Sequence, residues 1–91
     1  MTVKELYKKY KEYSIILYGE NKTFSLKDCI KNVSPFSFIY TMDSKRINNM
    51  EVIDVIVKNE SIESTNFSSK LEYIGKTQYK GTVYALVKEI K

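Results

Sequence analysis

The fold is decided by the stretch Met50-Glu51-Val52-Ile53-Asp54-Val55-Ile56-Val57-Lys58. Five of the six residues from Val52 to Val57 are valine or isoleucine, whose branched side chains fit the pleated surface of a strand. Side chains alternate along a strand, so both rows of this stretch are largely apolar, and Asp54 is the exception within its row. The pattern predicts an interior strand with both faces covered. A helix is expected on one face, and the rest of the chain or a second subunit on the other.

The N-terminal segment predicts a helix from Thr2 to Tyr13. Thr2 and Glu5 have the spacing of a capping box, in which each side chain satisfies a free backbone donor of the first turn. Val3, Leu6, Tyr7, Tyr10 and then Tyr13 or Ser14 follow helical spacing and form one stripe that is expected to pack on the sheet.

Alternation and turn residues predict the remaining elements. Strands are expected at 14–19, 23–26, 36–42, 70–74 and 82–90, with the last two forming a hairpin and 36–42 pairing antiparallel with the central stretch. Residues 27–32 fit either a helical turn capped by Ser25 or an extended edge segment. Polar loops are expected at 43–46, 59–69 and 75–81, the second of them mobile. The prediction is one α+β domain over residues 1–91: one N-terminal helix packed on a mainly antiparallel sheet of five to six strands.

Two isolated apolar residues lie in the polar segment 59–69. Ile62 and Phe67 are surrounded there by serine, threonine, asparagine and glutamate. An apolar residue in a loop usually packs back onto the core, and the alternative is an anchor for a partner.

The residue types argue against an enzyme. The chain has no histidine, the commonest general base near neutral pH and the commonest ligand of transition metals. Cys29 is the single cysteine and is expected to be a small buried hydrophobe in a reducing cytoplasm. The acids that could form a site are Asp28, Asp43 and the pair Glu51/Asp54, but Glu51 and Asp54 point to opposite faces of one strand, and no local spacing brings several carboxylates together. We therefore predict no catalytic residue, no metal and no cofactor.

The net charge of +4 and the pI near 9.1 leave nucleic acid open as a partner. Lys45 and Arg46 mark one predicted loop, and Lys76, Tyr79 and Lys80 another, where cations flank an aromatic ring that could stack on a base. These five are the candidate binding residues, and the alternative is a solvated loop tip. Arg46 is the only arginine among fifteen cations, which favours a compositional origin of the charge in an AT-rich genome.

More strand faces are apolar than one helix can cover, which predicts a homodimer or a protein partner. No segment is long and apolar enough for a membrane span or a signal peptide. We therefore expect a cytoplasmic protein without a membrane partner.

The opening Met1-Thr2-Val3-Lys4-Glu5-Leu6 and the run Lys45-Arg46-Ile47-Asn48-Asn49-Met50-Glu51-Val52-Ile53 resemble small orphan proteins of phages and mobile elements from low-GC Gram-positive bacteria. The resemblance implies inhibition of a host system, including CRISPR effectors and other defence machinery, or assistance to phage replication. Many inhibitors of this kind that mimic DNA are strongly acidic, whereas this chain is basic.

The leading functional hypothesis from the sequence is thus a non-enzymatic protein-binding module, a phage or mobile-element inhibitor or adaptor acting on a host protein. The alternative is a nucleic-acid or nucleotide binder that uses the basic loops.

Overall fold

The computed structural model of the chain describes residues 1–20, 22–33 and 44–89. Its elements are, in order, α1 (Val3–Lys9), β1 (Ser14–Gly19), α2 (Leu26–Asn32), α4 (Ser44–Asn48), β2 (Glu51–Lys58), β3 (Ile62–Phe67), β4 (Tyr73–Tyr79) and β5 (Thr82–Lys88). The predicted α+β class is confirmed, but the five strands form two sheets instead of one. The strand predicted at 36–42 lies outside the described residues.

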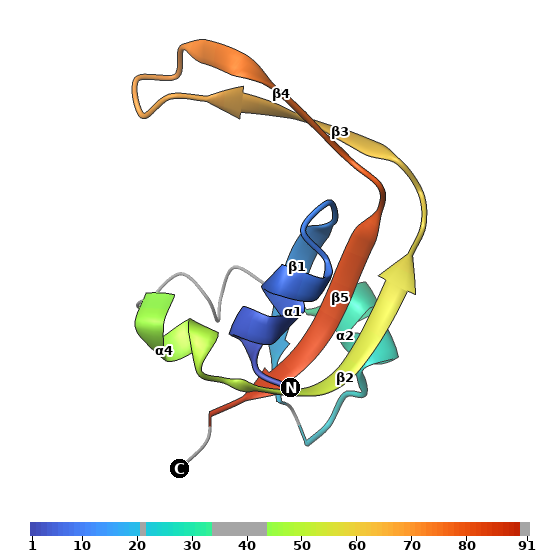
Figure 1. Cartoon of the computed structure of the whole chain (residues 1–91). Helices are drawn as coiled ribbons and strands as arrows, with labels where there is room; N and C mark the ends of the chain where they lie inside the picture. The colour runs from blue at the N-terminus through green and yellow to red at the C-terminus, as the bar shows by residue number, and fades with distance from the viewer. Residues whose placement is uncertain (21, 34–43, 90–91) are drawn as a thin grey trace.

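The larger sheet has three strands in the order β1-β5-β2 and forms the body of the molecule (Figure 1). β5 lies in the middle, parallel to β1 and antiparallel to β2. Among the described residues, β2 pairs only with β5 and β5 holds the middle position, whereas the sequence predicts that the stretch 50–58 is the interior strand. β5 carries two apolar rows as well, and only long-range pairing decides which of two such strands lies inside.

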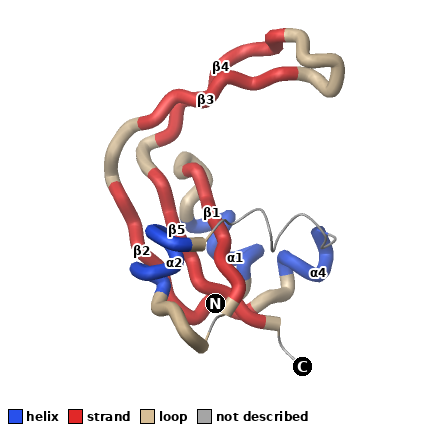
Figure 2. The backbone as a smooth tube through the Cα atoms, turned by 180° about the vertical axis from the view of Figure 1, so that it is seen from behind, coloured by secondary structure: helices blue, strands red, loops and turns tan. Residues whose placement is uncertain are grey.

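The two rows of β5 enter two separate cores. Val83, Ala85 and Val87 are fully buried on the side of α1, with Val3, Leu6, Leu17 and Met50. Tyr84 and Leu86 face α2, whose Leu26 and Cys29 pack with Tyr18. α1 thus covers the face of the sheet seen in Figure 1 and α2 covers the opposite face, seen in Figure 2.

Both covering helices begin at the caps that the sequence predicts. The Thr2 hydroxyl accepts from the Glu5 amide, and the Glu5 carboxylate accepts from the Thr2 amide, so the capping box is confirmed. α1 ends earlier than predicted, because Tyr10 leaves the helical conformation and the chain turns towards β1. Ser25 caps α2, so of the two alternatives predicted for residues 27–32 the helix is the one observed. The strand predicted at 23–26 is wrong, because α2 begins at Leu26.

The smaller sheet is the antiparallel pair of β3 and β4, which we call the arm. β3 continues from β2 and β4 leads into β5, so that the arm extends the β2–β5 hairpin beyond the body (Figures 1 and 2). Three predictions are wrong here. Residues 59–69 and 75–81 are largely strand instead of loop, and the last two strands do not pair with each other. Of the loop predicted at 43–46, residues 44–46 belong to helix α4.

No described helix is both long and apolar enough to span a bilayer.

Candidate protein-binding arm

The arm is a two-stranded ribbon that rises from the body and curves over it (Figure 1). Within the described part of the chain, neither strand of the arm has a second strand neighbour. An isolated two-stranded hairpin is only marginally stable in water, because it has no third layer in which to bury side chains. The arm therefore exposes side chains that a sheet in a core would cover.

Apolar side chains collect at the tip of the arm. Phe67, Leu71, Tyr73 and Ile74 are 57%, 83%, 60% and 65% exposed, and they are the four most exposed large apolar residues among those that the structure describes. The ring of Phe67 lies edge to face with that of Tyr73 across the strand pair. We call these four residues the apolar tip.

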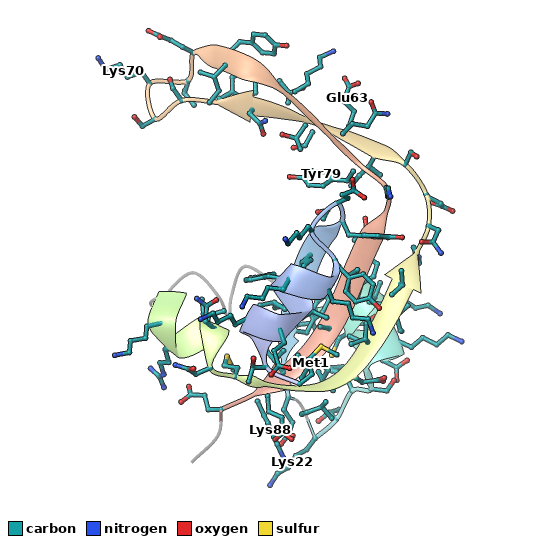
Figure 3. All side chains as sticks on the ribbon, in the orientation of Figure 1. Met1, Lys22, Glu63, Lys70, Tyr79 and Lys88 are labelled. Carbon is teal, nitrogen blue, oxygen red and sulfur yellow. The ribbon has the colours of Figure 1, made fainter. Side chains whose placement is uncertain are left out.

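A β-bulge interrupts the strand pairing beside the tip. Asn66 pairs with Gly75, but the next residue, Phe67, pairs with Tyr73, so that Ile74 is the extra residue of the bulge. Two residues of β4 therefore lie opposite Phe67 alone. Phe67 lies four residues after Glu63 on a regular strand and so shares its face. Figure 3 shows Glu63 on the outer side of the arm, away from the body.

The turn at the tip is built around Ser68. Its hydroxyl accepts hydrogen bonds from the backbone N–H groups of Lys70 and Glu72. The N–H of Ser68 donates to the carbonyl of Glu72, which closes the turn. Leu71 has a positive φ of 62°, which is uncommon for a branched residue, and its side chain is directed into solvent. The turn is thus held by hydrogen bonds and presents an apolar side chain at its end.

The inner face of the arm is tied to the body at its base. The carboxylate of Glu12 forms an ion pair of 2.6 Å with the Lys80 ammonium, and its backbone carbonyl accepts from the Lys80 N–H. The hydrogen bond to Glu12 and its charge raise the pKa of Lys80. The Tyr13 hydroxyl donates to the side-chain oxygen of Asn59 on the opposite strand of the connection. Both strands of the arm are therefore fixed where they leave the body.

A shallow pocket of about 340 Å³ lies between the base of the arm and α1, lined largely by Tyr7, Tyr10, Tyr13 and Tyr79. Figure 3 shows Tyr79 on the side of the arm that faces the body. Tyr10 and Tyr13 pack edge to face, with ring centroids 5.4 Å apart. Burial raises the pKa of Tyr7. Four tyrosines therefore line the hollow between α1 and the base of the arm.

The five candidate binding residues predicted from the sequence are not brought together. Lys45 and Arg46 are on α4, Lys76 and Tyr79 are on β4, and Lys80 follows at the base of the arm. Three of the four cations are paired with acids: Arg46 with Glu89, Lys76 with Glu63 at 2.9 Å and Lys80 with Glu12. At the arm, Lys76 and Lys80 are thus each paired with a glutamate.

The segment that contains the arm is also neutral as a whole. Residues 59–81 contain three lysines and three glutamates, so the segment has no formal net charge, whereas the whole chain has +4. An exposed apolar tip on a neutral ribbon is typical of a surface that contacts protein.

Sequence reasoning named only one member of the apolar tip. Phe67 was considered as an anchor, and the structure places it in solvent instead of against the core. Leu71, Tyr73 and Ile74 fall within the strand predicted at 70–74, and no feature of that pattern marks them as contact residues. The polar composition of the preceding segment, 59–69, is the one signal in the sequence for this exposure, because a polar segment cannot form an apolar layer over the strand.

Comparison of the chain with protein-family models, with curated proteins and with solved structures gave no match.

Proposed function

We propose that this chain is a non-enzymatic protein-binding module whose binding element is the apolar tip of the arm. One observation carries the proposal: four large apolar side chains lie more than half exposed at the end of a ribbon that is anchored at its base. Large aromatic and aliphatic side chains are the usual anchors of protein interfaces when a partner encloses them.

The free energy that burial of the apolar tip can contribute shows how much further contact a stable complex needs. Complete burial of a side chain of this size contributes about 1.5–3 kcal/mol, and these four are already partly covered, so the tip supplies roughly 5 kcal/mol. Association costs about 4–15 kcal/mol in lost freedom of motion. The tip alone therefore gives weak binding, and a stable complex requires further contact area. The backbone groups at the edges of β3 and β4 can supply it by pairing with a strand of the partner.

The mode of action in this proposal is occlusion or bridging of a partner protein. The resemblance to small phage and mobile-element proteins, together with the lack of histidine, favours an inhibitor or adaptor that acts on a host protein, including host defence machinery. The arm extends away from the body, so its tip can enter a groove of the partner while the body stays outside (Figure 1).

Site-specific photocrosslinking tests the proposal. A photoreactive phenylalanine analogue at Tyr73 is expected to crosslink to one defined protein in host cells. The same analogue at Ile53, an exposed apolar position on β2, is the matched control and is expected to give no such product. Loss of the crosslink in the variant Phe67→Ser/Ile74→Ser would confirm that the apolar tip is the contact. Equal crosslinking from both positions, or none from Tyr73, contradicts the proposal.

Salt separates this hypothesis from binding of nucleic acid through the arm. An apolar interface is expected to persist between about 50 and 200 mM salt, whereas phosphate binding weakens steeply over that range.

A further inference from the structure

A second pocket, of about 270 Å³, lies on the body between α2 and the end of β2, away from the tip of the arm. Its lining consists of three lysines and two isoleucines: Lys27, Ile30, Lys31, Ile56 and Lys58. Figures 1 and 2 show α2 beside β2 in both views. The pocket is a separate feature from the arm and shares no residue with the apolar tip.

Local structure explains why these residues meet. Lys27, Ile30 and Lys31 have the spacing i, i+3, i+4 on α2, which places them on one side of the helix. Ile56 lies near the end of β2 and belongs, with Ile30, to the half-buried layer beneath α2. Lys58 is the last residue of β2. The result is an apolar floor with ammonium groups at its rim, since lysine stems lie along apolar surface while their charges stay in water.

Among the described residues, the three pocket lysines lack the ion pairs that some of the other lysines form. Lys76, Lys80 and Lys88 each form an ion pair with a glutamate. Within the described parts of the chain, Lys27, Lys31 and Lys58 form none, and no carboxylate lines the pocket. The Lys58 ammonium lies 5.7 Å from the centre of the Tyr84 ring. Three uncompensated charges around one small hollow repel each other, and an anion bound between them would relieve that repulsion.

The geometry points to a site for a phosphate-bearing ligand of the nucleotide type. The lysines contact the phosphate oxygens as point charges, and the apolar floor of Ile30 and Ile56 packs against the face of the base. The volume of about 270 Å³ lies just below the usual range of about 300–1,000 Å³ for ligand sites, so the ligand is small, of the size of a single nucleotide unit. That unit is either a free nucleotide or one residue of a single-stranded nucleic acid, since both present the same chemistry. This site is independent of the proposed protein-binding arm.

Two variants with the same change in charge test the site. The pocket variant is Lys27→Gln/Lys31→Gln/Lys58→Gln, and the control is Lys4→Gln/Lys8→Gln/Lys9→Gln on α1. All six lysines are exposed, so both variants are expected to keep the circular-dichroism spectrum of the original chain. The probes are ATP, followed by amide shifts in NMR spectra, and a short fluorescein-labelled oligothymidylate, followed by anisotropy.

The original chain is expected to bind at least one of the two probes at about 50 mM salt. The pocket variant is expected to bind it at least about tenfold more weakly, because it loses up to three charge-assisted contacts. For the oligonucleotide, the slope of log K against log salt should also decrease by about 2. The control variant is expected to change affinity by less than about threefold. Binding of ATP alone identifies a free nucleotide as the source of the phosphate, and binding of the oligonucleotide alone identifies nucleic acid.

Three results would overturn the inference: no binding of either probe by the original chain, equal losses in the two variants, or a larger loss in the control. Equal losses would mean that only the diffuse positive field attracts the probe. The variant Phe67→Ser/Ile74→Ser is expected to bind the probe normally. A negative result for the phosphate site therefore does not affect the proposed function of the arm. A negative result for the arm likewise does not affect the phosphate site.

Discussion

The rings of Phe67 and Tyr73 lie edge to face across the arm, with centroids 6.5 Å apart and planes at 75°. More than half of each side chain is exposed. An edge-to-face pair contributes about 0.5–1.5 kcal/mol beyond the area that it buries. The pair therefore holds the end of the ribbon together while leaving most of its apolar surface for a partner.

Replacement of Phe67 by serine is expected to loosen the arm without unfolding the body. The lost ring pair weakens β3–β4 pairing by about 1 kcal/mol, whereas neither core contains Phe67. Native-state hydrogen exchange should show faster exchange of arm amides, such as that of Thr65, and unchanged protection in β5. Global unfolding caused by Phe67→Ser would contradict this division into body and arm.

Truncation of Leu17 to alanine is expected to destabilise the body by about 2–5 kcal/mol, because it leaves a cavity between α1 and the sheet. Leu17 is 1% exposed and belongs to the larger core. Urea unfolding measures the loss of free energy. Ile62→Ala is the matched control in the arm, and it should cost less than about 1 kcal/mol, because Ile62 is 38% exposed.

The elements of the body can be predicted from the sequence where the signal lies in neighbouring residues. Alternation at Ser14–Gly19 and Thr82–Lys88 predicts two of its strands, and the capping residues Thr2 and Ser25 mark where its helices begin. The order of the strands does not follow, because β2 and β5 each carry two apolar rows. Only pairing between distant residues places β5 in the middle.

The arm and the ion pairs of its lysines also depend on contacts between residues that are far apart in the sequence. Ser64, Thr65 and Asn66 have no apolar alternation, and they form a strand only because they pair with β4. Glu63 and Glu12 neutralise Lys76 and Lys80 from other segments, which no local pattern reveals. The sequence therefore indicated cations in loops where the structure has ion pairs on a ribbon.

The capping box of α1 provides a test of local stability. α1 has seven residues, too few to be stable alone, so the loss of one cap matters. Thr2→Ala removes the acceptor for the Glu5 amide and is expected to cost about 0.5–2 kcal/mol. Thr2→Ser retains the hydroxyl and should remain close to the original stability in the same urea experiment. Equal losses in the two variants would assign the effect to the methyl group instead.

Gly75 in the arm and Gly81 at its base are expected to respond differently to alanine. A Cβ at Gly81 would lie 2.1 Å from the backbone oxygen of Lys58, so β2 and β5 must move apart where the arm begins. Gly75 has a φ of +140°, but no atom lies within 4 Å of a Cβ there. Gly75→Ala is expected to cost about 1–3 kcal/mol of local strain in the arm, whereas Gly81→Ala should lower the melting temperature of the body. A larger decrease in the melting temperature from Gly75→Ala than from Gly81→Ala would contradict the close contact at Gly81.

The stability of the protein is expected to decrease above about pH 10, where tyrosine and lysine lose protons in the unfolded chain. Burial raises the pKa of Tyr7 and of Tyr18, and the hydrogen bond to Glu12 raises that of Lys80. All three groups thus hold their protons more tightly in the folded protein than in the unfolded chain. Their contribution is complete below the unfolded pKa values and is lost as the pH rises towards the folded values.

Urea unfolding at a series of pH values from about 8 to 11 measures this decrease. Tyr7→Phe removes one of the three titrating groups and keeps the ring in its place beside the arm, so it should make the decrease shallower. Tyr73→Phe is the matched control, because Tyr73 is exposed at the tip, and it should leave the profile unchanged. A flat profile up to pH 11, or equal effects of the two replacements, would show that burial of Tyr7 does not couple its ionisation to folding.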